Sequence, residues 1–571
     1  MSFSPMSSES FIILQTLLLV IVVSWAKAGL ADWSVFFIAA VVLIGVAGTP
    51  LLRKRETGGD AEIPWKATIP ILIFAVICVV GCLNPSYKKP STDSAAYADR
   101  DLWVTLATKD SRQLLDKVQS GQMEWEEWQN HRNFLKTVLL PELFRFKQRV
   151  ENGDAHGALA RLLLANRHLS DHPTETLFKP IFAIYIEDVE ADAFPWLPSS
   201  VYGSMEWSGL YLLVLVFIQG IWVFNYLATR SAIRWFFCAL AINCTLLAIA
   251  GIIQKLAYDP RSGHPEIWGV WKAPEPRYFF ASFTYKNHWC AYAALGFGIL
   301  AGLTTNWLRR YRSEIFRNSP LPLLLLSMGI LIVAITYSGS VLGVLLALSL
   351  AIPFFAFFLS FFVPRKIGFH FLCVLVAIII PASGTWLILE SQPEIKRETF
   401  QKVSERWQAL EEGRMPWRYY HSKDSLSMFS ARPAWGWGMG STATMYPKFV
   451  STEIIVESRE VLQYAHHGER FFGLKYSHND WFQYLAETGV CGVVLLMLTP
   501  MLALRGRRFS SSLALWPLIA CGSLALFSFF DFPSRTPACF IFFAVVFAAS
   551  LKYATRSGSQ ASLTTKRRLE I

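Results

Sequence analysis

One polar segment towards the C-terminus carries groups that can move a proton. It places the imidazole of His478 directly before the amide Asn479 and the carboxyl Asp480, and Glu487 follows in the same stretch. The unperturbed pKa of histidine is about 6.5, so His478 can accept or donate a proton near neutral pH. A neighbouring amide or carboxyl can orient that imidazole. The segment therefore predicts acid–base chemistry at His478, with Asn479, Asp480 and Glu487 as supporting groups.

The same segment also fits a purely structural interpretation. Trp481 and Tyr484 would lie at the level of the lipid headgroups, and the polar residues around them would simply be hydrated. Gly489 and Gly492 come shortly afterwards, and their lack of a side chain would let a neighbouring helix or a lipid headgroup approach closely. Spacing alone leaves both interpretations open.

A second stretch combines cations with a glycine-rich loop. The guanidinium of Arg418 can clamp a phosphate or pyrophosphate, because its planar fork matches those oxygens bidentately. The loop that follows has glycines at alternate positions, Gly436, Gly438 and Gly440, which allow tight turns or close approach to a ligand. A surface arginine beside a structural turn is the alternative. The strand and helix pattern of a dinucleotide-binding fold does not surround this loop.

Two further stretches lie at the ends of apolar runs. Arg277 and Lys286 precede the amide Asn287 at the start of one run, where they could serve as snorkelling, aromatic-rich interfacial anchors or as functional cations. The stretch 336–340 joins two runs and predicts a tight outer turn.

The composition indicates a membrane protein. Of the 571 residues, 53% are hydrophobic and 17% are charged, whereas soluble domains carry about 25% charged residues. The net charge of +11 would suggest a nucleic-acid partner only if the cations gathered on a soluble domain, but they lie mostly at the ends of apolar runs. The nine cysteines lie within or beside apolar runs, so neither disulfides nor a metal site is predicted. These features exclude a disordered chain, a disulfide scaffold and an ordinary cytosolic enzyme.

The apolar runs predict an all-α, polytopic fold. A span takes roughly 20 apolar residues, and the sequence has about twelve such runs, near 11–30, 33–52, 67–83, 207–227, 235–256, 287–305, 320–337, 340–363, 367–389, 482–504, 513–531 and 538–551. Basic residues concentrate in one set of short connections, which predicts that both termini are cytoplasmic and that the two long hydrophilic segments lie outside.

The chain therefore divides into five expected parts. These are N-terminal transmembrane helices (1–83), a periplasmic helical insert (84–206), central transmembrane helices (207–389), a periplasmic catalytic loop (390–481), and C-terminal transmembrane helices with a cytoplasmic tail (482–571). Leucines at helical spacing in the insert predict its helices. We expect the insert to be an accessory cap and the loop to carry the chemistry.

Taken in order, these stretches resemble the O-antigen ligase and polymerase superfamily of bacterial envelope glycosyltransferases. The family's histidine motif is a His, then Asn, Ser or Gln, nine residues, Gly, two residues, and Gly, Thr or Tyr. This sequence has His478-Asn479, nine residues to Thr488, and then Gly489 and Gly492. The stretch 426–440 resembles the family's Pro-x-x-Gly-x-Gly-x-Gly segment, with Arg418 where a functional arginine is usual.

The resemblance covers roughly residues 205–550. Phe283 and Asn287 fit the family's Gly-x-Phe-x-x-x-Asn pattern, with Ala281 in place of the glycine. Two departures concern side chains. The common Ser-Arg-Gly of the outer turn has Gly339 in place of its arginine, and Ser422 stands where an aromatic residue is usual. The long insert is also not part of the usual pattern.

The resemblance implies a GT-C-like membrane glycosyltransferase that needs no nucleotide, metal or other cofactor. It would move a glycan from undecaprenyl-pyrophosphate to an acceptor hydroxyl of a lipid A core or a similar glycan, on the periplasmic side of the bacterial inner membrane. His478 would be the general base of an inverting transfer, supported by Asp480 and Glu487, with Asp424 as a weaker candidate. Arg418, with Arg277 or Lys286, would hold the pyrophosphate.

Several alternatives share these features. An O-antigen or exopolysaccharide polymerase and a protein O-oligosaccharyltransferase carry the same motifs, so the acceptor stays open. A membrane transporter is the rival from another class. Ion-coupled carriers usually place ionisable residues at mid-depth in their spans, whereas the apolar runs here hold almost none, a pattern that favours chemistry at the interface.

Overall fold

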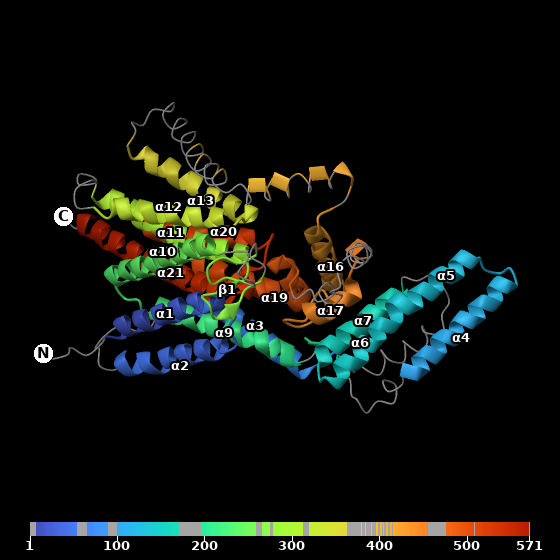
Figure 1. Cartoon of the computed structure of the whole chain (residues 1–571). Coiled ribbons are helices and arrows are strands. Elements are labelled where there is room, and N and C mark those ends of the chain that lie inside the picture. Colours follow the sequence, from blue (N-terminus) through green and yellow to red (C-terminus); the bar gives the residue numbers. More distant parts are fainter. Residues whose placement is uncertain are drawn as a thin grey trace. The chain divides into compact units, whose positions relative to one another are not determined.

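A computed structural model shows an almost entirely helical chain (Figure 1). The structure describes residues 7–53, 65–88, 100–170, 194, 196–201, 203–258, 265–274, 278–311, 319–362, 379, 383, 390, 396, 397, 400, 401, 404, 407, 408, 411–413, 415–451, 453, 454, 476–507 and 509–569. Within these residues the sheet is one antiparallel pair, β1 (Glu266–Ile267) and β2 (Trp271–Lys272). The helical class is confirmed.

The longer helices have the following bounds: α1 (Ser8–Trp25), α2 (Ser34–Arg53), α3 (Trp65–Leu83), α4 (Arg100–Gln119), α5 (Trp125–Phe134), α6 (Leu140–Glu151), α7 (Ala155–Ser170), α9 (Gly203–Tyr226), α10 (Arg230–Ala257), α11 (Lys286–Arg310), α12 (Leu321–Tyr337), α13 (Val341–Ser360), α16 (Trp417–Ala431), α17 (Thr442–Phe449), α19 (Asp480–Leu504), α20 (Ser512–Phe527) and α21 (Pro537–Leu569).

Several of these helices can cross a membrane. In the described part of the chain, seven are long and apolar enough, namely α1, α3, α9, α10, α13, α19 and α21, and three shorter apolar helices are α2, α12 and α20. The chain is therefore a multi-pass membrane protein. The predicted run 287–305 forms α11, which has the length of a span but is more polar, and the run 367–389 lies almost wholly outside the described residues. The total of twelve spans stays a prediction.

The chain folds into two compact units. The first, the membrane unit, comprises Met1–Ile69, Leu212–Arg414 and Thr499–Ile571. The second, the motif unit, comprises Pro70–Tyr211 and Met415–Leu498. The motif unit thus combines the whole range of the predicted insert with the part of the chain that carries the arginine and histidine motifs.

Helix α11 forms the centre of the membrane unit. Every residue from Asn287 to Thr305 is buried, because α10, α12, α13 and α20 pack around it (Figure 1). Gly298 and Gly302 lie one turn apart on the side that faces α20. A Cβ atom at Gly298 would overlap the Cβ atom of Ala520, and one at Gly302 would press on Pro517 and the backbone of Leu513. This small-residue spacing brings the two helices into close contact, as is common between membrane helices.

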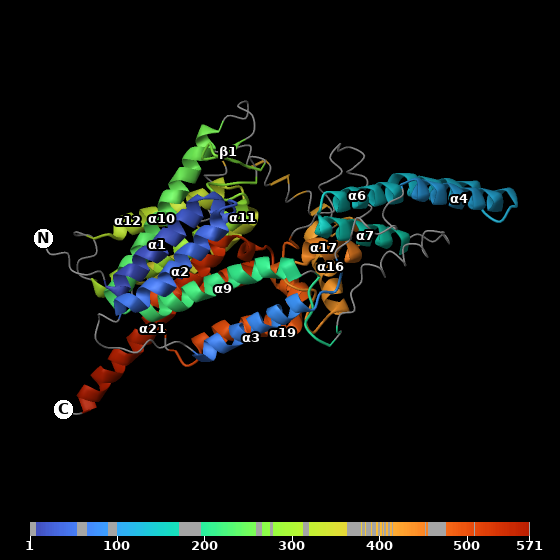
Figure 2. The ribbon, with the colours of Figure 1, turned by 90° about the horizontal axis from the view of Figure 1, so that it is seen from below.

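In the motif unit most of the described residues of the insert are helical, as predicted. Helices α6 and α7 form a hairpin around buried leucines that include Leu159 and Leu162, and α7 also packs against α17 (Figure 2). The apolar core of the hairpin continues into Met445 and Tyr446 of α17 and into Met428 of α16. The insert and the motif segment therefore share one hydrophobic core.

Candidate functional site

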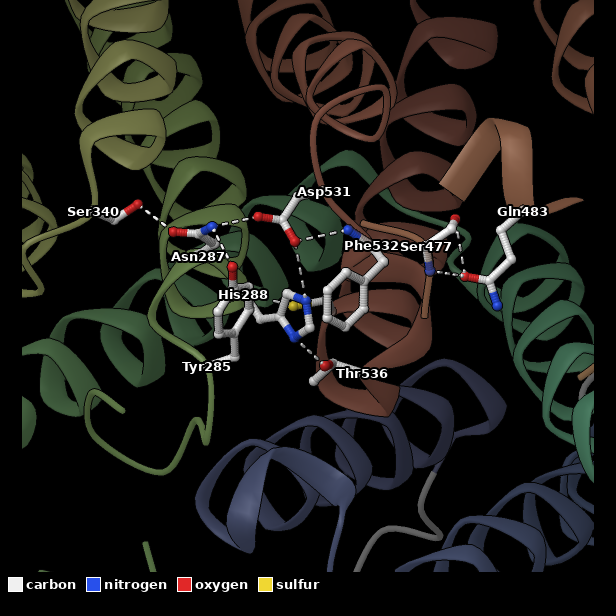
Figure 3. Close-up of polar contacts among 10 residues, drawn as sticks. Tyr285, Asn287, His288, Ser340, Ser477, Gln483, Asp531, Phe532 and Thr536 are labelled. Atoms are coloured by element: carbon white, nitrogen blue, oxygen red, sulfur yellow. Dashed lines mark hydrogen bonds and ion pairs between the residues drawn. The ribbon is translucent and has the colours of Figure 1, made fainter. Parts of the chain in front are cut away.

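The histidine motif forms a capped helix start in the motif unit. The side chain of Asn479 accepts a hydrogen bond from the backbone N–H of Phe482 at 3.0 Å and so caps α19. Ser477 donates its backbone N–H to the Gln483 side chain at 3.0 Å, which ties the preceding loop to the first turn (Figure 3). Between these anchors His478 has a φ of 55°, a left-handed conformation that a histidine seldom adopts. Because fixed neighbours hold this backbone, the imidazole projects from a rigid corner.

Glu487 connects the histidine motif to α17. Its carboxyl group is fully buried and accepts hydrogen bonds from the Thr442 hydroxyl at 2.7 Å and the Gln483 amide at 2.8 Å. Both donors bind the same carboxylate oxygen, Oε1, and the bond from Thr442 joins two segments 45 residues apart. The geometry is consistent with a supporting role, because Glu487 holds the helix that follows His478. Asn479 and Asp480 are also buried, whereas His478 is half-buried.

The two predicted glycine motifs pack against each other. Gly436 has a φ of 71°, and a Cβ atom there would lie 2.5 Å from the carbonyl carbon of Glu487. Gly489 has a φ of 63°, and a Cβ atom there would overlap the backbone of Ala434. The backbone N–H of Gly438 donates to the Glu487 carbonyl at 2.8 Å. At these positions the glycines thus allow backbone to meet backbone.

The other motif glycines shape the turns of the loop and the packing of α19. Gly438 and Gly440 also have positive φ values, 90° and 78°, and so shape the tight turns of the loop. Gly492 lies one turn after Thr488, and a Cβ atom there would approach the ring of Phe74 at 3.2 Å. Gly492 therefore lets α19 and α3 come close within the motif unit.

Helix α16 brings three polar side chains onto one face. It begins after Pro416 and ends before the Arg432–Pro433 pair, because a residue preceding proline disfavours helical geometry. Arg418, His421 and Asp424 follow one another at intervals of three residues, which places them along one side of the helix. Arg418 is half-buried, whereas His421 and Asp424 are buried.

His421 lies beside both residues that the sequence singled out. Its ring stacks on that of His478, with the centroids 6.3 Å apart and the planes inclined by 28°. Burial lowers the pKa of His421 to about 4, and the nearby His478 and Arg418 add to this effect. The structure therefore brings Arg418, His421 and His478 together in the motif unit. The two residues predicted from the sequence, Arg418 and His478, both lie beside a second histidine, His421.

A buried chain of hydrogen bonds continues from His421. Its Nδ1 lies 2.7 Å from the Tyr446 hydroxyl, which in turn donates to the Asp424 carboxylate at 2.7 Å. Burial raises the pKa of Asp424, while the hydrogen bonds from Tyr446 and Ser451 oppose that rise. Burial also raises the pKa of Tyr446, so the phenol keeps its proton. Helical spacing on α16 could have indicated His421, but nothing in the sequence indicates Tyr446.

A second buried polar cluster lies in the membrane unit. The amide of Asn287 accepts a hydrogen bond from Ser340 at 2.5 Å and donates to Asp531, while Thr536 lies 2.6 Å from Nδ1 of His288 (Figure 3). The other ring nitrogen of His288 lies 3.7 Å from the Asp531 carboxylate. Sequence reasoning singled out Asn287 but did not predict that it meets Asp531. The cluster joins the start of α11 to the turn before α21.

The remaining predicted cations differ in position. The ammonium group of Lys286 donates to the backbone carbonyl of Gly339 at 2.8 Å, so it lies on the turn where the family has an arginine. Arg277 lies outside the described residues. Among the described residues, no group of three or more histidine, cysteine or carboxylate side chains could hold a metal ion.

Comparison with known proteins identifies the region that carries these motifs. Residues 323–497 match the family model described as O-antigen ligase. No curated protein and no solved structure matches the chain. The matched region includes α16, α17 and the start of α19, and hence Arg418, His421 and His478. The predicted resemblance is confirmed over residues 323–497, which are similar to the O-antigen ligase family.

Proposed function

We propose that the protein is an O-antigen ligase-like glycosyltransferase. It moves a glycan from undecaprenyl-pyrophosphate to a hydroxyl group of a lipid A core or similar acceptor, on the periplasmic side of the inner membrane. The O-antigen ligase family implies a lipid-linked glycan donor and a glycan acceptor in general. The observation that carries the proposal is the proximity of Arg418 and His478, which both lie next to His421.

The donor's pyrophosphate would bind to Arg418. Its guanidinium is half-buried on α16, so it can reach a ligand while the helix holds its backbone. Charge-assisted hydrogen bonds of this kind contribute on the order of 1.5–3 kcal/mol each. Negative charge on the leaving pyrophosphate grows as the glycosidic bond breaks, so these contacts strengthen in the transition state.

His478 would act as the general base. Its half-buried imidazole can meet an acceptor hydroxyl, whereas the buried carboxyl groups of Asp480 and Glu487 stay in supporting positions. The hydroxyl oxygen attacks the anomeric carbon, its proton passes to His478, and the bond to the pyrophosphate oxygen breaks. A positioned base typically contributes about 10²–10⁴-fold to the rate.

Lys286 is another cation that the family resemblance assigns to the donor's pyrophosphate. It lies on the turn formed by residues 338–340, where its ammonium group is bound to the carbonyl of Gly339. A lysine reaching this turn from α11 can substitute for the charge of the arginine that the family has there, although it cannot provide the same bidentate fork. Arg277 is the other candidate for this role.

The test is a deletion strain complemented with the wild-type gene, His478→Ala or Arg418→Ala. We expect the wild type to restore the glycan product and both variants to lose at least about 10²-fold in transfer. Lys423→Ala is the matched control, because Lys423 lies on the same helix and forms an exposed ion pair with Glu453.

The product that accumulates in the deletion strain identifies the acceptor class. Long carrier-linked chains indicate a ligase, and single carrier-linked repeats indicate a polymerase. Loss of glycan from a protein would indicate an oligosaccharyltransferase. Full restoration of the product by His478→Ala, with the variant present at wild-type level, would show that His478 is not the base.

A further inference from the structure

We infer that Asp424, Tyr446 and His421 form a relay that orients His478 for proton transfer. In this relay His421 is a positioning residue, which acts on the reaction through His478 and not by contact with the transferred glycan. The inference rests on the proposed function, because it assigns a role to side chains that stand behind the proposed base.

The direction of the relay follows from the number of available protons. A tyrosine hydroxyl has one proton, and Tyr446 donates it to the Asp424 carboxylate at 2.7 Å. The Tyr446 oxygen must then accept the hydrogen bond at 2.7 Å from Nδ1 of His421. A neutral His421 therefore carries its hydrogen on Nδ1, and its Nε2 keeps a lone pair.

That lone pair lies in the plane of the His421 ring, which is inclined by 28° to the neighbouring ring of His478. Among the described residues, Nε2 of His421 has no hydrogen-bond partner within the chain. The 6.3 Å between the ring centroids is a distance that a small side-chain shift or one bridging water can span. If Nε2 of His421 accepts an N–H from His478, the other nitrogen of His478 is left bare and can take the proton of the acceptor hydroxyl.

The relay is built into the core of the motif unit. His421, Asp424 and Tyr446 are all buried, and Tyr446 belongs to the apolar core that α17 shares with the insert helix α7. The charged or titratable groups that face His421 are Arg418 and Asp424 from α16, Tyr446 from α17, and His478. When His478 takes up its proton, the positive charge lies at one end of a hydrogen-bonded chain whose other end is a carboxylate. In catalytic triads a carboxylate likewise stabilises the positive charge of the histidine that takes up the proton.

The test uses the full-length protein with a carrier-linked donor and its acceptor. Asp424→Asn gives residue 424 an N–H donor, so Tyr446 can turn its hydroxyl towards Nδ1 and the hydrogen of His421 moves to Nε2. Tyr446→Phe removes the relay's central hydroxyl. We expect each variant to lower kcat by about tenfold to a hundredfold with KM for donor and acceptor within about twofold. The double variant should be no slower than either single variant, because all three interrupt the same chain.

Ser425→Ala is the matched control. It also removes a buried hydroxyl from α16, but that hydroxyl bonds only to the backbone carbonyl of His421. We expect it to keep wild-type kcat. If Asp424→Asn or Tyr446→Phe fails to fold, His421→Asn replaces it, since an asparagine amide can still donate to Tyr446 but has no atom at the position of Nε2.

The outcomes separate the relay from the proposed function. If His478→Ala abolishes transfer while the folded relay variants keep wild-type kcat, the relay is wrong and the transferase proposal stands. The relay is also wrong if the reductions of kcat add in the double variant, or if the variants change KM and leave kcat at the wild-type value. If His478→Ala keeps full activity, the proposed function itself fails.

Discussion

Burial keeps His421 neutral in the folded protein, so the free energy of unfolding should depend on pH in the range where His421 titrates. In the unfolded chain it titrates near its ordinary pKa of about 6.5, whereas in the folded protein burial lowers the pKa to about 4. Between these values the unfolded state binds a proton that the folded state does not. The free energy of unfolding should therefore fall as the pH drops from about 6.5 to 4, by at most about 1.4 kcal/mol per pH unit, and this contribution is complete above pH 6.5.

Thermal unfolding of the solubilised protein at pH 4–7.5 measures this effect. The control is His421→Asn, which retains a donor to Tyr446 but does not titrate. We expect the midpoint temperature of the wild type to fall more steeply than that of the variant below pH 6.5, with parallel curves above it. Parallel curves over the whole range would contradict a buried, neutral His421.

At the scale of elements, the junction of the glycine loop with α19 is where a small substitution should have a large effect. Gly489→Ala introduces a methyl group against the backbone of Ala434 and Trp435 at a φ of +63°. With its ψ of −174°, Gly489 has a backbone conformation that is almost confined to glycine and costs on the order of 1–3 kcal/mol for a residue with a Cβ atom. The collision adds to this because backbone atoms cannot rotate away. We expect lower stability together with reduced transfer, since the same helix begins at the histidine motif.

Gly121→Ala separates the two causes of that loss. Gly121 has a φ of +75° in the same unit, but a Cβ atom there would meet nothing within 4 Å. It therefore measures the effect of a Cβ atom at a positive φ without the collision. Thermal unfolding and transfer assays of both variants should show a clearly larger defect for Gly489→Ala, and equal defects would show that the two motifs are not held together by backbone contact.

Sequence predicts the elements of this junction better than it predicts their contacts. His478 and Arg418 could be found because each lies in a motif with characteristic spacing. The bonding between the Gly436 loop and residues 486–491 could not, since the segments are far apart in the chain and no local spacing pattern links them. Tyr446 was missed for the same reason. Its position depends on the contact of α17 with α7, which no local pattern encodes.

At the scale of the whole molecule, composition and hydropathy correctly indicate a helical, multi-pass membrane protein. They do not fix the number of spans. Helix α11 shows why, because it is buried on all sides within the membrane unit and so does not need the apolar surface that lipid contact demands. Its polar start, with Asn287 and His288, lowers its hydropathy further. A central helix of this kind is long enough to span a membrane, yet it has a weak hydropathy signal.

The orientation of the chain is a prediction that reporter fusions can test. The C-terminal stretch contains Lys552, Arg556, Lys566, Arg567 and Arg568, and an excess of lysine and arginine next to a span favours the cytoplasm. We expect a fluorescent protein fused after Ile571 to be active and alkaline phosphatase fused there to be inactive. Phosphatase inserted in the insert near Gly121, where a turn with open space should tolerate it, should be active. The reverse pattern would place His478 and the insert on the side of the membrane where the carrier-linked glycan is not presented. That result would contradict the proposed transfer even with Arg418 and His478 close together.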